Sequence, residues 1–182
     1  MNDDPREARL IARAQQGDGE AYGVLVSEYL RRVVAIAFSI VRNGHDAEDL
    51  AQEAFVKAYQ SIGRFRAGAA FGPWIGRIVT NLALDVVKHR TKFRHDAIDD
   101  THRATRRDDA ELPAMQSDLA SRIDAALDEL PDMQRIVARL HLVEEMEQAE
   151  IAAVLGLSAG TVRSHLSLAR TKLKARLADL YD

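Results

Sequence analysis

The stretch EQAEIAAVLGLSAGTVRSHLSLARTKL, residues 147–173, decides the fold expected for this chain. Its first part predicts a short helix over residues 148–155 that ends at Gly156, because glycine adopts the left-handed turn that other residues avoid. Ser158 is a favourable N-cap for a second helix over residues 159–177. The inward positions of this second helix follow helical spacing and are Val162, Leu166, Ala169 and Leu173. Two helices joined in this way form a helix-turn-helix, which presents its second helix to the major groove of DNA.

The outward positions of that second helix are small, hydroxylated or basic, which is what contact with base edges and phosphates requires. They are Gly160, Thr161, Arg163, Ser164, Ser167 and Arg170. The alternative is an ordinary helical hairpin with a basic tail. Because the turn, the cap, the core spacing and the charge all agree, the sequence favours the DNA-binding interpretation.

The rest of the chain also predicts helices, since no sustained two-residue period indicates a strand. Four helices are expected before a charged linker, over residues 5–16, 20–41, 46–62 and 73–88. Two more are expected before the helix-turn-helix, over residues 118–130 and 131–143. The expected fold is therefore all-α, with two small helical domains over residues 1–92 and 118–182 and a linker over residues 93–117.

Local signals predict several helix ends and buried faces. Asp4 would cap the first helix, Asp46 with Asp49 has the pattern of a capping box for the third, and Pro73 would open the fourth. The third helix should bury Leu50 or Ala51, Ala54, Phe55, Ala58, Tyr59 and Ile62. The fourth should bury Trp74, Ile75, Ile78, Val79 and Leu82.

The composition excludes several chemistries. The 182 residues include no cysteine, which excludes disulfides, thiolate catalysis and cysteine zinc sites and fits a reducing compartment. The N-terminal MNDDPREARL lacks the apolar core of a signal peptide. The longest apolar stretch, residues 33–41, is interrupted by Ser39 and is too short to span a bilayer. We therefore expect a cytoplasmic protein without membrane insertion.

The net charge of −3 hides an uneven distribution. Residues 108–150 hold twelve acidic and three basic side chains, whereas residues 159–177 hold five basic and no acidic ones. Residues 88–94 hold four basic and no acidic ones. Two positive patches on an acidic body favour docking to phosphates, although two solvated helix ends would show the same pattern.

A second motif, DAEDLAQEAFVKAYQ, spans residues 46–60 and sets several carboxylates beside Gln52. Glu48, Asp49 and Glu53 have no histidine partner at ligand spacing, and like charges on one helix face normally lie in solvent. Neither catalysis nor metal binding is therefore expected from them. An exposed acidic face that includes a glutamine fits a protein-docking surface better.

A third motif, FRAGAAFGPWIGRIVTNLALDVVKHRTK, spans residues 65–92 and sets aromatic residues beside a flexible loop. The helix that follows carries a polar line along its outside, made of Arg77, Asn81, Asp85 and Lys88. Aromatic rings that hold bases and cations that follow the backbone suit single-stranded nucleic acid. The alternative is that the aromatic residues only form the core at a helix corner. They are Phe65, Phe71 and Trp74.

Histidines and aspartates gather near the linker. They are His89, His95, His102, Asp96, Asp99 and Asp100. Their spacing fits no compact metal motif, so chance in a charged segment is the better account. No metal and no cofactor are expected.

Together these motifs resemble the sigma-70 family, and specifically its small extracytoplasmic-function (ECF) sigma factors. The resemblance covers about residues 9–88 and 119–177. Residues 46–55 look like the family's motif for gripping the clamp helices of the polymerase β′ subunit. Residues 65–81 look like the loop and helix that open and read the promoter −10 element. Residues 130–131, 151–156 and 160–164 look like the domain that reads the −35 element.

The resemblance implies a dissociable initiation subunit that is not an enzyme. Its implied partners are core RNA polymerase, through the β′ clamp helices and the β subunit, promoter DNA and an anti-sigma factor. The residues implied in core-polymerase binding are Asp46, Glu48, Asp49, Gln52 and Glu53. Those implied at the −10 element are Phe65, Arg66, Phe71, Arg77, Asn81 and Lys88. Those implied at the −35 element are Thr161, Arg163, Ser164, His165, Ser167 and Arg170.

The same residues are open to two other interpretations of function. One is a stand-alone helix-turn-helix repressor or activator whose N-terminal half dimerises. The other is a small helical metal-dependent hydrolase, for which the sequence offers no credible ligand set. Binding to core polymerase distinguishes the sigma factor from both.

Overall fold

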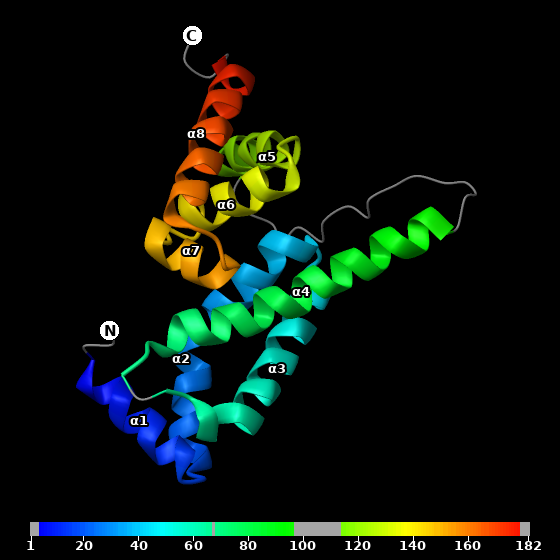
Figure 1. Ribbon diagram of the computed structural model, residues 1–182. Helices are drawn as coiled ribbons and strands as arrows, with labels where there is room; N and C mark the ends of the chain where they lie inside the picture. The colour runs from blue at the N-terminus through cyan, green and yellow to red at the C-terminus, as the bar shows by residue number, and fades with distance from the viewer. Residues whose placement is uncertain (1–3, 67, 97–113, 179–182) are drawn as a thin grey trace. The chain divides into compact units, whose positions relative to one another are not determined.

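The computed structural model describes residues 4–66, 68–96 and 114–178, which form helices and no strand (Figure 1). The helices are α1 (Pro5–Gln15), α2 (Gly19–Val41), α3 (Gly44–Ser61), the 3₁₀ helix η1 (Ile62–Arg64), α4 (Phe71–Asp96), α5 (Ala114–Asp128), α6 (Asp132–Leu142), α7 (Gln148–Leu155) and α8 (Ala159–Arg176). The all-α prediction is confirmed. The chain divides into two compact units, the first built largely on α1 to α4 and the second on α5, α6, α8 and most of α7.

The first unit is a small bundle in which α2 packs against both α1 and α3. Its core is apolar, and the side chains of Leu25 in α2 and Phe71 in α4 are 0% exposed. Burial of each such side chain contributes about 2 kcal/mol. Tyr22 of α2 ties α2 to α3, because its hydroxyl donates to the Phe55 carbonyl oxygen at 2.6 Å.

Helix α1 begins as the sequence predicts, whereas α3 begins two residues earlier. Asp4 caps α1 by accepting a hydrogen bond from the Arg6 N–H at 2.8 Å. For α3 the cap is Asn43, whose Oδ1 accepts from the Asp46 N–H at 3.0 Å. The predicted capping box of Asp46 and Asp49 is therefore wrong. Asparagine is as good an N-cap as aspartate, and here it lies where the chain leaves α2.

Helix α4 also begins before its predicted start, at Phe71 instead of Pro73. The Phe71 N–H donates to Oε1 of Glu7 in α1 at 3.0 Å, so the cap comes from a residue 64 positions away in the chain. Pro73 still lies in the first turn, where backbone N–H groups have no partner within the helix, so its missing N–H costs no hydrogen bond.

Two predicted buried faces need correction. The fully buried line of α4 is Ile75, Val79 and Ala83, each 0% exposed. Trp74, Ile78 and Leu82, which were predicted inward, are only partly buried. In α3, Tyr59 is 43% exposed and rests against Tyr22, with the ring centroids 4.9 Å apart. These residues lie at the edge of the apolar stripe, where helical spacing alone does not decide burial.

Part of the predicted linker is helical. Helix α4 continues to Asp96 and α5 begins at Ala114, so residues 93–96 and 114–117 belong to helices. Residues 89–96 contain neither proline nor glycine, so nothing in the sequence stops α4 at residue 88. Residues 97–113 of the predicted linker lie outside the described residues.

The second unit closes around a cluster from α5, α6 and α8. The cluster consists of Ala126, Leu127, Leu130, Ala138, Ala169 and Leu173. Arg139 of α6 is 8% exposed and joins α6 to α5. It forms ion pairs with Asp124 at 3.0 Å and Asp128 at 3.3 Å.

Within the described ranges, no single helix is long and apolar enough to cross a membrane. Helices α7 and α8 reach that length and composition only when counted together, across a bend of 111°.

Candidate functional site

The helix-turn-helix of α7 and α8 has the predicted local geometry. Gly156 follows α7 with a φ of 66°, the left-handed conformation expected at that turn. Ser158 caps α8, with its Oγ accepting from the Thr161 N–H at 3.0 Å. All four predicted inward positions of α8 are buried. The outer side of α8 is thereby left free for contacts.

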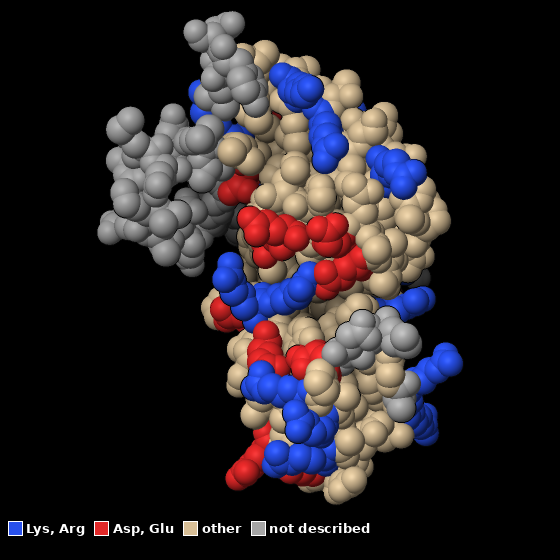
Figure 2. All heavy atoms as spheres, turned by 90° about the vertical axis from the view of Figure 1, so that its left-hand side faces the viewer, with Lys and Arg blue, Asp and Glu red and all other residues tan. Residues whose placement is uncertain are grey.

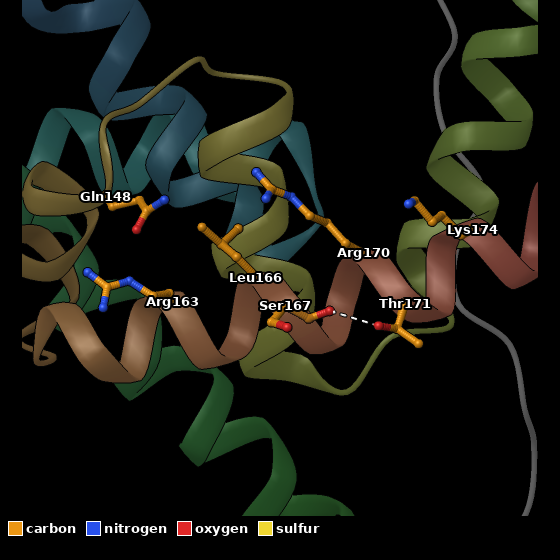
Figure 3. Close-up of a pocket in the computed structure, with 7 residues that line it drawn as sticks. All are labelled: Gln148, Arg163, Leu166, Ser167, Arg170, Thr171 and Lys174. Atoms are coloured by element: carbon orange, nitrogen blue, oxygen red, sulfur yellow. Dashed lines mark hydrogen bonds between the residues drawn. The ribbon is translucent and has the colours of Figure 1, made fainter.

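That outer side of α8 and the start of α7 enclose a hollow of about 370 Å³ (Figure 3). It is lined by Gln148, Arg163, Leu166, Ser167, Arg170, Thr171 and Lys174. Figure 3 shows Gln148 coming from α7 on the same side as Arg163, while the other labelled side chains come from α8. Three cations and no carboxylate line the hollow, which favours an anionic ligand such as a DNA phosphate.

Three of the predicted −35 residues line this hollow: Arg163, Ser167 and Arg170. The other three do not. Ser164 is exposed elsewhere on α8, and the Thr161 hydroxyl lies 2.8 Å from Ser158 Oγ, within the cap. His165 is half-buried, and its Nδ1 is a buried atom without a hydrogen-bond partner in the described structure.

Gln148, Thr171 and Lys174 also line the hollow, and the sequence did not predict them as contact residues. A signal was available for Lys174, because residues 163, 167, 170 and 174 recur at four, three and four and share one helix face. Gln148 had no such signal, since it reaches the hollow from a different helix. The Thr171 hydroxyl donates to the Ser167 carbonyl oxygen at 3.1 Å (Figure 3).

The predicted docking residues all lie on α3 but differ in exposure and in the ion pairs that they form. Glu48, Asp49, Gln52 and Glu53 are exposed, whereas Asp46 is half-buried. Glu53 pairs with Lys57 on the same helix at 2.8 Å. Asp46 pairs with Arg90 of α4 at 2.9 Å, so it also joins two helices. An exposed ion pair such as that of Glu53 with Lys57 contributes little stability, about 0.5 kcal/mol. Glu53 therefore remains available to a partner.

The aromatic residues of the third motif form a packed cluster. The ring centroids of Phe65 and Trp74 are 4.8 Å apart, those of Phe71 and Trp74 5.5 Å, and those of Tyr29 and Phe71 5.3 Å. Phe65 is 6% exposed and Phe71 is 0% exposed. This burial leaves neither phenylalanine ring accessible to a base and favours the alternative interpretation, that they form the core at a helix corner.

The charged and polar −10 candidates are exposed. Arg66 lies in the loop before α4, and Arg77, Asn81 and Lys88 lie along α4. Lys88 is within 3.5 Å of Asp85 on the same helix. The structure therefore leaves a polar line on α4 beside a buried aromatic cluster.

Acidic and basic side chains alternate in small groups on the face drawn in Figure 2. No single sign of charge covers that face. Attraction to nucleic acid therefore depends on local groups of cations, such as the three around the α7–α8 hollow.

A metal site is not apparent in the part of the chain that the structure describes, where no three His, Asp or Glu side chains gather. Of the histidines near the predicted linker, His89 is exposed on α4. His102, Asp99 and Asp100 lie outside the described residues.

Two family models match the chain, Sigma-70 region 2 over residues 25–93 and Sigma-70, region 4 over residues 120–173. The chain is 33% identical over 180 residues to the ECF RNA polymerase sigma factor SigE of Mycolicibacterium smegmatis, covering 97% of this chain and 70% of that protein. It is 31% identical over 181 residues to the ECF RNA polymerase sigma factor SigW of Bacillus subtilis, covering 94% of this chain and 97% of that protein. Among solved structures, CnrH in complex with the cytosolic domain of CnrY matches with a TM-score of 0.71 and 29% identity, over 96% of this chain and 98% of the matched chain.

Proposed function

The chain belongs to the sigma-70 family of RNA polymerase sigma factors, in its ECF group, and on this premise we propose how its exposed faces divide the work of transcription initiation. It is an initiation factor and not an enzyme. The two matched regions fall on different units, so separate faces for separate partners are expected.

The exposed face of α3 docks on the clamp helices of core polymerase. Glu48, Asp49, Gln52 and Glu53 supply carboxylate and amide oxygens there, free of contacts with other helices among the hydrogen bonds and ion pairs of the described residues. A group of acids with one glutamine suits a basic and polar partner surface, where charge complementarity speeds association and sets orientation. This exposed face is the observation that carries the proposal.

The loop before α4 and the outer line of α4 capture the melted −10 strand. Arg66, Arg77, Asn81 and Lys88 are exposed and can follow phosphates and base edges. Phe65 and Phe71 are buried members of the aromatic cluster and support this surface by packing, without contacting the strand.

The hollow on α8 binds the −35 duplex. Arg163, Ser167 and Arg170 face the groove, and Gln148 and Lys174 hold the flanking phosphates. Most of the binding strength comes from the polymerase that carries the factor, since only three cations line the hollow.

The protein acts in the cytoplasm, where an anti-sigma factor holds it inactive until it is needed. The resemblance drawn from the sequence implies such a partner, and CnrH, whose structure this chain resembles, was solved in complex with the cytosolic domain of CnrY. The absence of cysteine fits a reducing compartment.

The docking proposal is tested with the double variant Asp49→Ala, Gln52→Ala in the full chain. Loss of two central contacts should weaken affinity for core polymerase by more than about thirtyfold. The measurement is a binding titration with fluorescently labelled protein and purified core enzyme. A matched control is Gln16→Ala, Glu20→Ala, which removes one amide and one acid from exposed positions away from α3.

Core affinity that stays at the wild-type level would remove α3 as the docking face. Tight binding of the wild-type chain to duplex promoter DNA without any binding to core would favour a stand-alone regulator. Unchanged circular dichroism of both double variants shows that the fold is intact.

A further inference from the structure

Helix α1 holds both ends of the segment that joins α3 to α4, and it lies alongside that segment in Figure 1. At the near end, the side-chain amide of Gln15 donates from Nε2 to the carbonyl oxygens of Ile62 and Phe65, each at 3.0 Å. At the far end, Oε1 of Glu7 accepts from the backbone N–H of Phe71, the first residue of α4, at 3.0 Å. Two polar side chains of one helix therefore bracket the loop that carries Arg66.

The far contact is buried and has further partners. Glu7 is 7% exposed, and its Oε2 accepts a hydrogen bond from the Tyr29 hydroxyl. A buried carboxylate is stable only when donors surround it, and the first N–H groups of a helix are donors without partners in their own helix. The negative charge also lies at the positive end of α4. Glu7 therefore fixes where α4 begins.

The start of α4 is also fixed by shape. Gly72, the second residue of α4, packs against the ring of Tyr29 so closely that an added Cβ would lie 2.8 Å from Cε1. The same ring lies 5.3 Å from the ring of Phe71, measured between centroids. Tyr29 thus contacts Glu7, Phe71 and Gly72. These contacts fix the position of the first turn of α4.

We propose that Glu7 and Gln15 are positioning residues for capture of the −10 strand, although neither touches DNA. This inference rests on the proposed role of the loop and α4 in −10 binding. With Phe65 and Phe71 both held, the residues at the two ends of the loop keep their places before the strand arrives, and less conformational entropy is lost on binding. Without these contacts the loop and the first turn of α4 lose their common register, and Arg66 and Arg77 no longer align on one strand.

The test uses holoenzyme assembled from core polymerase and the full chain. The probe is a promoter that wild-type holoenzyme selects from a randomised duplex pool, with 2-aminopurine in its −10 segment to report opening. The variants are Glu7→Ala, Glu7→Gln and Gln15→Ala. Gln16→Ala is the matched control, since it removes the neighbouring amide at an exposed position whose cap contacts come from its backbone.

We expect Glu7→Ala and Gln15→Ala each to lower the equilibrium constant for opening by about tenfold, because each variant loses two hydrogen bonds that hold one end of the segment. Affinity for core polymerase should stay within about twofold of wild type. Glu7→Gln keeps an acceptor oxygen for the Phe71 N–H and should restore most of the opening. Because Gln15 is an exposed residue, its variant folds even where Glu7→Ala unfolds the unit.

Wild-type opening in Gln15→Ala and Glu7→Ala would overturn the inference. So would a parallel fall in opening, core affinity and melting temperature, because that pattern indicates general destabilisation. If wild-type holoenzyme opens no promoter at all, the proposed −10 function fails instead, and the two failures remain distinguishable.

Discussion

Single side chains of the first unit link helices through hydrogen bonds. Tyr22 of α2 makes a buried one, donating to the Phe55 carbonyl oxygen of α3, and the exposed Gln15 of α1 makes two part-buried ones, donating to two carbonyl oxygens near η1. Each such bond contributes about 1 kcal/mol net, but leaving one partner buried and unpaired costs about 1–3 kcal/mol. The helices are therefore held in register by a few polar atoms as well as by apolar packing.

The Tyr22 hydroxyl makes stability depend on alkaline pH. Burial raises the pKa of Tyr22 from 10.0 to about 12, and the pKa of Tyr29 is raised too, by burial and by its hydrogen bond to Glu7. The folded state therefore favours the neutral phenol. This contribution to stability is complete below the unfolded-state pKa and is lost as pH rises through the folded pKa, at a rate of up to about 1.4 kcal/mol per pH unit for each tyrosine.

We predict that the free energy of unfolding of wild-type protein falls between about pH 10 and about pH 12, and that Tyr22→Phe shows a smaller fall over this range. Urea titrations at several pH values measure this. Tyr59→Phe is the control, since Tyr59 is 43% exposed. Equal slopes for Tyr22→Phe and wild type would show that Tyr22 titrates as it does in water.

At the scale of the element, Gly156 in the turn between α7 and α8 and Gly160 in the first turn of α8 differ in what their backbone requires. Gly156 has a φ of 66°, a conformation that an L-residue adopts only with strain. Gly160 lies in the first turn of α8, where a Cβ would make an ordinary 3.7 Å contact with Ser158 Oγ. The first glycine is needed for its backbone, whereas the second only adds freedom to the unfolded chain.

Alanine substitution should therefore change stability in opposite directions at the two sites. Gly156→Ala should lower the free energy of unfolding by about 1 kcal/mol, because of left-handed strain. Gly160→Ala should raise it by about 0.5 kcal/mol, because alanine is the better helix former. Guanidinium titrations of the full chain, followed by circular dichroism, supply both values. A loss at both positions would mean that Gly160 is constrained by something other than its helix.

At the scale of the whole molecule, the proposed function places three contact surfaces on one chain: the α3 face, the α4 line with its loop, and the α8 hollow. Each is built from side chains of a single unit. None needs to bind tightly by itself, because a contact made within an assembled polymerase is effectively intramolecular. Modest cation numbers at the −35 surface are consistent with this division.

Promoter choice by holoenzyme should separate base contacts from phosphate contacts. Arg163→Ala should cost about 1–3 kcal/mol on the preferred −35 sequence and less on others, as loss of a base contact does. Lys174→Ala should weaken all promoters equally and reduce the slope of log affinity against log salt by about 1. Competitive transcription from a promoter set, repeated over a salt series, measures both effects. If Arg163→Ala weakened all promoters equally, Arg163 would be a phosphate contact.

Much of the fold was predictable because its signals are local. The Gly156 turn, the Ser158 cap and the inward spacing of α8 are read within a few residues, and the structure confirms each of them. The start of α3 was predicted two residues late, because Asn43 competes with Asp46 as a cap and only the backbone geometry decides between them. The acidic face of α3 was predictable for the same reason, since helical period alone places it opposite the apolar stripe.

The sequence by itself determined the all-α class, the helix-turn-helix and the exposed faces of α3, α4 and α8, because helix period and caps are encoded over short distances. Only the tertiary structure decided that Phe65 and Phe71 are buried, that Gln148 joins the α8 hollow, and that Glu7 fixes the start of α4. These contacts join residues far apart in the chain. They depend on how whole helices pack, and no local pattern carries that information.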